Sequence, residues 1–576
     1  MNASQLLAHF DRLAEAPGAV PRLRRFILDL AVRGKLVAQD AGDEPAAELL
    51  KRIRAERLRV LKKPVKGNAT ADAKLDGTDV ELPTGWAWSK LGDLCTKTGS
   101  GSTPAGGKDS YAASGVPFLR SQNVYDDGLR LDGVAFISDA TQDRMSSTTV
   151  KAGDLLLNIT GGSIGRCAIV PDSFVVGNIN QHVAIIRLAL PGGARFLHSV
   201  VRSDYFQRHI FGNQTGAGRE GLPKNRMDEI LIPVAPLPEQ HRIVAKVDEL
   251  MALCHQLEAA QQERERRRDR LASASLQRLN QPAAYTTPEA QREHARFHLH
   301  HLPRLTTRPE HIKAMRQTIL NLAVRGLLVP QDVDDEPANA LLQEIHHQKA
   351  QLVRLGAIPK EKTLAEQPLL TFSLPVLWQA VRLGNLCNLV TSGSRGWAEF
   401  YAKSGPKFLR AQNIRFGRLR LDDLACVNPP ARSEGARTQV QQGDLLIVIT
   451  GAGVTNPAVL DRDLGAAYVS QHVALVRPTT ATLSRWLLLC LMAGPSGRDE
   501  LVQRAYGAGK PGLNLDNIRS LNVPLPPLAE QHRIVAKVDE LMTLCDELEA
   551  QLNNTQTDSR RMLEAVLDAA LIPTNG

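Results

Sequence analysis

The stretch EQHRIVAKVDELM, from Glu239 to Met251, recurs letter for letter from Glu530 to Met542. Thirteen identical residues in a row do not recur by chance, so the chain contains an internal duplication. Other stretches pair in the same order at offsets of 290 to 292 residues: ILDLAVRGKLV from Ile27 with ILNLAVRGLLV from Ile319, FLRSQN from Phe118 with FLRAQN from Phe408, and GDLLLNITG from Gly153 with GDLLIVITG from Gly443. The chain of 576 residues is therefore one unit written twice, and we expect two modules related by approximate two-fold symmetry.

The repeated stretch predicts the start of a long helix in each copy. Apolar residues follow it at alternating spacings of four and three, which is the seam of a coiled coil: Ile243, Val247, Leu250, Cys254 and Leu257, then Ile534, Val538, Leu541, Cys545 and Leu548. Neither Gly nor Pro interrupts residues 239–281 or 530–571. Each helix can therefore extend for ~60 Å at about 1.5 Å per residue. We assign long spacer helices to residues 237–281 and 528–576.

The rest of each copy divides into parts of different composition. Residues 82–236 and 375–527 are rich in Gly and Thr and contain short β-type runs such as DLLLNIT and DLLIVIT, which predict buried strands in a mixed α+β domain. Residues 1–81 and 309–374 show helix-type apolar spacing and are predicted to be helical lead-ins. The Pro, Thr and His content of residues 282–308 predicts a linker.

Composition narrows the class of protein. Lys and Arg total 70 against 61 Asp and Glu, and this excess of positive charge suits a nucleic-acid partner. The seven cysteines form no CxxC pair, which argues against a zinc ribbon and a disulfide framework and favours a reducing compartment. No apolar run reaches the ~18 residues of a membrane span, and the N-terminal stretch does not resemble a secretory signal. We therefore expect a cytoplasmic protein without a membrane partner.

The sequence lacks motifs that are typical of catalysis. The sequence has no GxxxxGK[ST] loop and no HExxH. NPPA, from Asn428 to Ala431, lacks the aromatic residue with which adenine methyltransferases stack on a flipped base. We therefore predict a non-catalytic chain with no metal site and no cofactor of its own.

Two longer lines, IPVAPLPEQHRIVAKVDELMALCHQLE and LNVPLPPLAEQHRIVAKVDELMTLCDELE, resemble the specificity subunits of type I restriction-modification systems. The resemblance is supported by TGSGSTPAGG from Thr98 and covers nearly the whole chain. It implies that each mixed segment is a target recognition domain, and that the long helices pack antiparallel as a coiled-coil spacer. It also implies recognition of a bipartite site on double-stranded DNA. The implied partners are two methyltransferase subunits with S-adenosylmethionine, for methylation of adenine, and restriction subunits with ATP and magnesium.

Two other functions are compatible with parts of the sequence. A fused restriction or methyltransferase polypeptide would carry the catalytic motifs that the sequence lacks. A scaffold that binds only protein would use the long helices as its docking surface. Sequence-specific retention of DNA would distinguish a specificity subunit from such a scaffold.

The duplication separates two classes of candidate DNA-binding residues. Arg120, Gln122 and Asn123 recur as Arg410, Gln412 and Asn413, and their identity favours a duty shared by both copies, such as phosphate contact. Loops that differ between the copies are better candidates for contacts with base edges, because the two halves of a bipartite target differ. From these loops we select Ser100, Ser102, Thr103, Lys108, Arg219 and Lys224 in the first copy, and Arg395, Trp397, Arg504, Tyr506 and Lys510 in the second.

Overall fold

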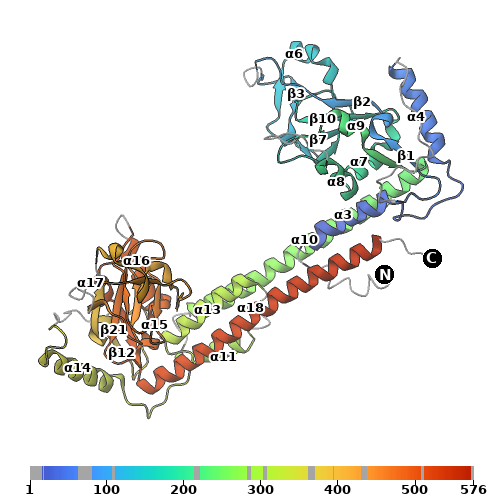
Figure 1. Cartoon of the computed structure of the whole chain (residues 1–576). Helices are drawn as coiled ribbons and strands as arrows, with labels where there is room; N and C mark the ends of the chain where they lie inside the picture. Colours follow the sequence, from blue (N-terminus) through green and yellow to red (C-terminus); the bar gives the residue numbers. More distant parts are fainter. Residues whose placement is uncertain are drawn as a thin grey trace. The chain divides into compact units, whose positions relative to one another are not determined.

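The computed structural model describes residues 16, 18–61, 81–106, 111–212, 221–281, 287–301, 306, 308–360, 370–393, 395–429, 437–506 and 511–571. The chain forms two compact units. Unit 1 comprises residues 1–263 and 556–576, and unit 2 comprises residues 264–555. Each contains one mixed domain, its own lead-in helices, the first part of its own long helix and the last part of the other long helix (Figure 1).

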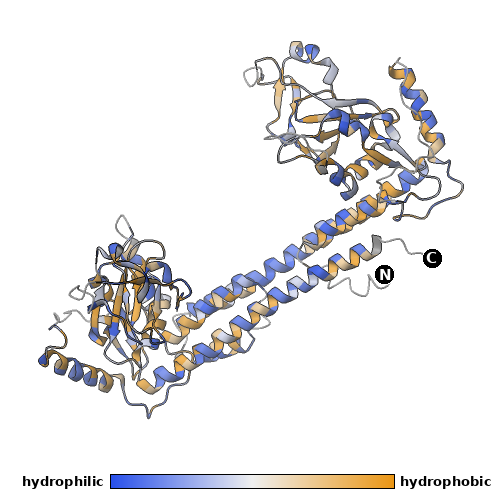
Figure 2. Cartoon of the chain, in the orientation of Figure 1, coloured by the Kyte–Doolittle hydropathy of each residue, from blue (hydrophilic) through white to orange (hydrophobic). Residues whose placement is uncertain are grey.

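The long helices are α10, Leu237–Asn280, and α18, Leu528–Leu571. Polar and apolar residues alternate along both, as a single apolar stripe requires (Figure 2). The stripe of α10 is used inside unit 1, where Ile243, Val247 and Cys254 are buried in one core with Ile27 of α3, Ala19–Val32. The apolar seam of α10 therefore packs on the lead-in helix of the same copy. The coiled-coil interpretation of the sequence did not predict this contact. The antiparallel pairing of α10 with α18 stays a prediction.

Unit 2 repeats this packing. Ile534, Val538 and Cys545 of α18 share a core with Ile319 of α13, Pro309–Val324. Equivalent ion pairs join the helices, since Arg24 contacts Glu258 at 2.6 Å and Arg316 contacts Glu549 at 2.8 Å. A second lead-in helix follows in each unit: α4, Ala46–Leu61, and α14, Ala338–Arg354.

The mixed domain of unit 1 is built on a four-stranded antiparallel sheet. Its strand order is β2-β10-β7-β8, with bounds Cys95–Ser100, Val183–Leu188, Leu155–Asn158 and Cys167–Ile169. The residues of β7 are all buried because helices cover one face and a smaller sheet the other. That smaller sheet has the order β6-β3-β9, with bounds Ala135–Ile137, Val116–Leu119 and Asn178–Ile179.

The domain closes on itself. Strand β1, Ala87–Lys90, pairs antiparallel with β11, Leu231–Val234, so the chain enters and leaves the domain side by side, directly before α10. A short hairpin completes the strands, formed by β4 and β5, Val124–Tyr125 and Gly128–Leu129. The helices include α6 to α9, with bounds Asp139–Arg144, Ala194–Arg202, Asp204–Gly212 and Lys224–Glu229.

Unit 2 has the same strand orders, which confirms the predicted α+β tandem duplication. Its main sheet is β13-β21-β18-β19, with bounds Cys387–Ser392, Val473–Pro478, Leu445–Val448 and Pro457–Val459. The smaller sheet is β17-β14-β20, with bounds Ala425–Val427, Tyr401–Leu409 and Ala467–Val469. The paired ends are β12, Gln379–Arg382, and β22, Asn522–Leu525. The hairpin is β15–β16, Ile414–Arg415 and Arg418–Leu419, and the helices α15 to α17 span Leu483–Met492, Asp499–Tyr506 and Leu515–Arg519.

The predicted linker differs from the structure. Within residues 282–308 lies helix α11, Pro288–His300, whose first turn is capped by Thr287. A Thr followed by Pro is a helix start as well as a loop signal, and the linker interpretation took only the second meaning. Ala295 of this helix is buried against Leu279, Leu322 and Leu327, so the segment packs on its unit. No helix in the described part of the chain is long and apolar enough to cross a membrane.

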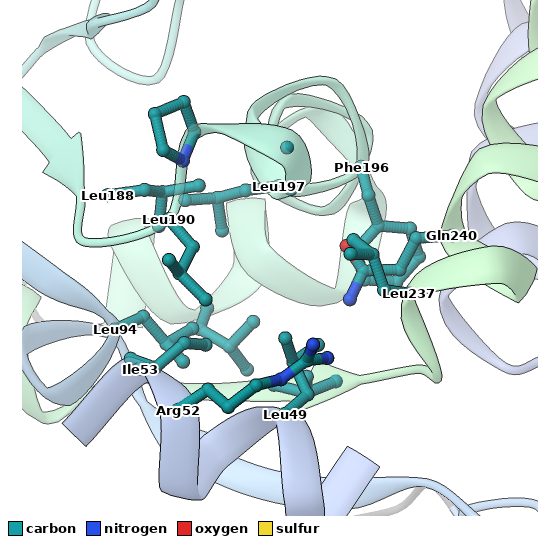
Figure 3. Close-up of a pocket in the computed structure, with 15 residues that line it drawn as sticks. Leu49, Arg52, Ile53, Leu94, Leu188, Leu190, Phe196, Leu197, Leu237 and Gln240 are labelled. Carbon is teal, nitrogen blue, oxygen red and sulfur yellow. The ribbon is translucent and has the colours of Figure 1, made fainter. Parts of the chain in front are cut away.

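A pocket of about 300 Å³ lies between α4 and the mixed domain of unit 1 (Figure 3). Gly193 and Phe196 line it, and their counterparts in unit 2 are the larger residues Leu483 and Trp486, both fully buried. The indole of Trp486 donates a hydrogen bond of 2.8 Å to the carbonyl of Pro524. The pocket therefore arises from two smaller residues on a shared frame. Its lining is mainly apolar: Leu49, Ile53, Leu94, Leu188, Leu190, Leu197 and Leu237, with Arg52 and Gln240 as polar members.

Candidate nucleic-acid interface

The repeated EQHR stretch joins each long helix to its mixed domain and to the lead-in segment of the same copy, and we call this set of contacts the lock. The indole of Trp86 donates to the Glu239 carboxylate at 3.0 Å, and Arg242 contacts Asp43 at 2.8 Å. In unit 2 Trp378 donates to Glu530 at 2.9 Å, and Arg533 contacts Asp335 at 2.6 Å. Both glutamates are buried, and burial raises the pKa of each. The most strongly repeated residues thus hold the frame together.

The strand register of unit 1 gathers several loops at one end of the main sheet. Ser100 at the end of β2 lies opposite Ala184, and Asn158 at the end of β7 lies opposite Val183. The loops that follow β2 and β7, and the loop that precedes β10, therefore meet at this end, which we name the loop end.

Two further segments join the loop end of unit 1. The amide of Leu222 donates to the carbonyl of Ile159 at 2.9 Å, which brings in the residues before α9. The side-chain amide of Asn158 donates to the carbonyl of Ser121 at 2.9 Å, which brings in the turn η2, Ser121–Asn123.

Unit 2 forms an equivalent loop end. Ser392 lies opposite Ala474, and the amide of Leu513 donates to the carbonyl of Ile449 at 2.9 Å. Gly393, directly after β13, approaches the backbone of Val469 so closely that a Cβ would lie 2.1 Å from its carbonyl oxygen. Glycine is therefore required there, as at Gly101 in unit 1, where the corresponding distance to Ile179 is 1.9 Å.

Part of the predicted contact set is exposed at the loop ends. In unit 1 these residues are Ser100, Ser102 and Thr103, with Lys224 at the start of α9. The hydroxyl of Thr103 donates to Gln181, and Lys224 pairs with Asp228, so both side chains are already oriented. Arg395 is exposed in unit 2. Gln122, in the turn η2, and Gln412, in the equivalent turn of unit 2, are exposed as well.

Arg120 and Arg410 lie at the starts of these matching turns, η2 and η7, where η7 is Ala411–Asn413. Both are half-buried, and the Nε atom of each is buried without a hydrogen-bond partner among the described residues. The guanidinium of Arg120 lies 5.7 Å from the ring centre of Tyr111, and that of Arg410 lies 3.8 Å from Asp423. Each guanidinium keeps hydrogen-bonding capacity for an external acceptor.

Asn123 and Asn413 were predicted to contact DNA, and the structure contradicts this. Both are buried, and the carboxamide oxygen of each accepts a backbone N–H from Arg120 or Arg410 at 3.0 Å. Their amide groups donate to the carbonyls of Arg130 at 2.8 Å and Arg420 at 3.1 Å. They therefore shape the turn, and this duty explains their presence in both copies.

The structure also corrects two predictions in unit 2. Trp397 is only 5% exposed and stacks on Phe408, with ring centres 5.8 Å apart, so it belongs to a small aromatic core. Arg504 is held inside the unit by Glu500 at 2.8 Å and by the hydroxyl of Ser520 at 2.7 Å. Both were predicted to lie in loops, where bulky and charged residues suit DNA, but in the structure both side chains stabilise the fold.

Four more candidates are not placed by the structure. Lys108, Arg219 and Lys510 lie outside the described residues, and so does the side chain of Tyr506. Their assignment to DNA contact stays a prediction.

Two copies of one α+β domain, each locked to a long helix and carrying differing loops at one end of its sheet, define a duplicated recognition protein. Residues 83–265 and 375–556 match the family described as type I restriction modification DNA specificity domain. These residues form more than half of the chain and include both mixed domains. The chain belongs to this family and is a specificity subunit of the type I class, as its motifs predicted.

Curated relatives agree over nearly the full length. The specificity subunits of the type I restriction enzymes EcoAI and EcoEI, both from Escherichia coli, are each 28% identical over 96% of this chain and 94% of their own length. The solved HsdS subunit from Thermoanaerobacter tengcongensis is 21% identical, with 86% of this chain and 98% of that chain covered at a TM-score of 0.44.

Proposed function

We propose that each mixed domain reads one half of a bipartite site on double-stranded DNA with its loop end. The observation that carries this proposal is the pairing of one repeated frame with differing loops. Strand order and lock are the same in both units, while TGSGSTPAGG from Thr98 is replaced by TSGSRGWAEF from Thr391. Loop ends that bound the same sequence would have no reason to diverge on a frame that is kept in both copies.

The proposed contacts follow this division. Arg120 and Arg410, with Gln122 and Gln412, bind the sugar-phosphate backbone in both half-sites, because residues shared by two readers carry no sequence information. Base edges are contacted by exposed residues of the differing loops, namely Ser100, Ser102, Thr103, Lys224 and Arg395, together with Lys108, Arg219, Tyr506 and Lys510.

The relatives are named as subunits of type I restriction enzymes, which indicates other subunits as partners. We propose two methyltransferase subunits, which bring S-adenosylmethionine, and restriction subunits, which bring ATP and magnesium. In this arrangement the chain supplies the choice of site and its partners supply methylation of adenine and cleavage. The fused enzyme is set aside by the family assignment, and the protein-only scaffold is an outcome of the following test.

The chain offers its own donor for a domain exchange. Residues 91–230 lie between β1 and β11, and residues 383–521 are the same part of unit 2. Replacing the first by the second preserves both locks, because Trp86 and Glu239 are outside the exchanged part. Duplexes bound by the full-length chain are then selected from a random-sequence pool and sequenced.

We expect the wild type to select two different half-sites and the exchanged chain to select the second half-site twice. The reverse exchange is the matched control and should give the first half-site twice. An unchanged selected sequence would refute the assignment of one domain to one half-site. A folded wild type that selects no sequence would favour the scaffold.

A further inference from the structure

The two mixed domains differ in charge at one short hairpin. In unit 1 the hairpin β4–β5 has the sequence YDDGLR from Tyr125, with two acidic residues at its turn. In unit 2 the hairpin β15–β16 has the sequence RFGRLR from Arg415, with three arginines and no acid. We call residues 125–128 the first tip and residues 415–418 the second tip.

The charges of the first tip are used internally. Asp126 accepts the backbone N–H of Cys167 at 3.0 Å, and Asp127 pairs with Arg130 at 2.6 Å. The ring of Tyr125 lies under Arg166, whose guanidinium is 4.8 Å from the ring centre. This tip has a satisfied local network.

The second tip is not neutralised in the same way. Arg415 and Arg418 are directly opposite each other in the hairpin register, and both are exposed. Neither makes an ion pair or a hydrogen bond with any residue that the structure describes. The field of Arg415 reaches Asp422, but this carboxylate accepts from Arg420 with both oxygens, at 3.0 and 3.1 Å. Like charges placed opposite each other destabilise a strand pair, and an anion bound between them removes the repulsion.

The second tip lies at the loop end of unit 2. The amide of Gly417 donates to the carbonyl of Pro457 at 2.9 Å, and Pro457 is the first residue of β19, directly after the loop that follows β18. Phe416 lies under Arg498, which is 5.0 Å from the ring centre and bonded to the carbonyl of Thr455 at 2.5 Å. The tip is therefore anchored beside the loops that we assign to DNA.

We propose that Arg415 and Arg418 bind phosphate groups of the DNA duplex, so that unit 2 has an electrostatic clamp that unit 1 lacks. This inference rests on the proposed function, because it takes the loop end to face DNA. Guanidinium groups suit this ligand, since their planar N–H donors match the oxygens of a phosphate. The clamp adds affinity on any sequence and makes binding by unit 2 the more sensitive to salt.

The test measures binding of the full-length chain to a random-sequence duplex pool between 50 and 200 mM salt. Each neutralised phosphate contributes about 0.9 to the slope of log affinity against log salt. The double variant Arg415→Ala, Arg418→Ala should therefore reduce the magnitude of this slope by about two. Between 50 and 200 mM salt, its loss of affinity should then be about tenfold smaller than that of the wild type. Arg420→Ala is the matched control, because Arg420 directly follows the same hairpin and is already paired with Asp422, and it should change the slope by much less.

A slope that stays the same in the double variant would overturn the clamp. Arg418→Glu separates binding from folding, because it places opposite charges across the hairpin. It should keep or raise the melting temperature while lowering DNA affinity to about that of the double variant. Parallel loss of stability and affinity would overturn the clamp in favour of a structural role.

The pool also separates this inference from the proposed function. A wild type that selects two half-sites, with no change of slope in the double variant, refutes only the clamp. A wild type that selects no sequence, with the expected reduction of slope in the double variant, refutes only the reading of half-sites.

Discussion

Asp29 gives unit 1 a dependence on pH that unit 2 does not share. It lies in α3, is buried, and accepts the backbone N–H of Asp204 at 3.1 Å. Burial, assisted by the carboxylate of Asp204, raises its pKa from 3.8 to about 6. The same position in unit 2 is Asn321, whose carboxamide oxygen accepts the backbone N–H of Gly494 at 3.0 Å. The equivalent contact in unit 2 therefore shows that a neutral side chain can accept this backbone N–H.

The sign and size of the effect follow from this pKa. A carboxyl whose pKa is raised on folding favours the folded state when it is protonated, and this contribution to stability is fully present below about pH 4. That stability is lost as the pH rises through about 6. A shift of about two units corresponds to about 3 kcal/mol in the free energy of unfolding. Asp29→Asn removes the charge and retains the acceptor, so it should stabilise unit 1 at pH 7.5 by up to about 3 kcal/mol.

The assay is hydrogen exchange of peptides from α3 and α8, which are both in unit 1, at pH 5 and pH 7.5 after correction for intrinsic rates. The wild type should lose protection in these peptides between the two pH values, and Asp29→Asn should abolish that loss. Asn321→Asp is the matched control and should introduce the same loss into α13 of unit 2. If protection in α3 of Asp29→Asn still fell by the wild-type amount, the assignment of the pH dependence to Asp29 would be refuted.

Three further predictions concern the shared frame and use melting temperature as their first measurement. Phe196→Trp should fill the pocket of unit 1 and raise the free energy of unfolding by about 1–2 kcal/mol, whereas Trp486→Phe should lose its hydrogen bond and lower that free energy by about 2–3 kcal/mol. Equal shifts of the same sign in both variants would contradict this account of the pocket. Asn123→Ala should cost about 1–3 kcal/mol and leave the selected DNA sequence unchanged, whereas a changed sequence would restore it as a reader. Trp86→Phe should cost about 2–4 kcal/mol, since it leaves buried Glu239 without its donor, and a second substitution, Glu239→Leu, should recover part of that loss.

The sequence alone predicted the duplication, the α+β class, the long helices and the family. These features depend on local periodicity and on identity between the copies, both of which can be read along the chain. The EQHR stretch shows the limit of that approach. Its identity marked it as important, but its partners Trp86 and Asp43 are distant in sequence, so its role as a lock was not visible.

The tertiary structure decided which polar residues are available to a ligand. Asn123, Trp397 and Arg504 have side chains typical of DNA contacts, yet each is used by the fold. The two hairpin tips show the opposite case, because only the strand register places Arg415 against Arg418 without a neutralising partner among the described residues. Residue type and spacing are local properties, whereas exposure and charge pairing are sums over neighbours that the chain brings together only when it folds.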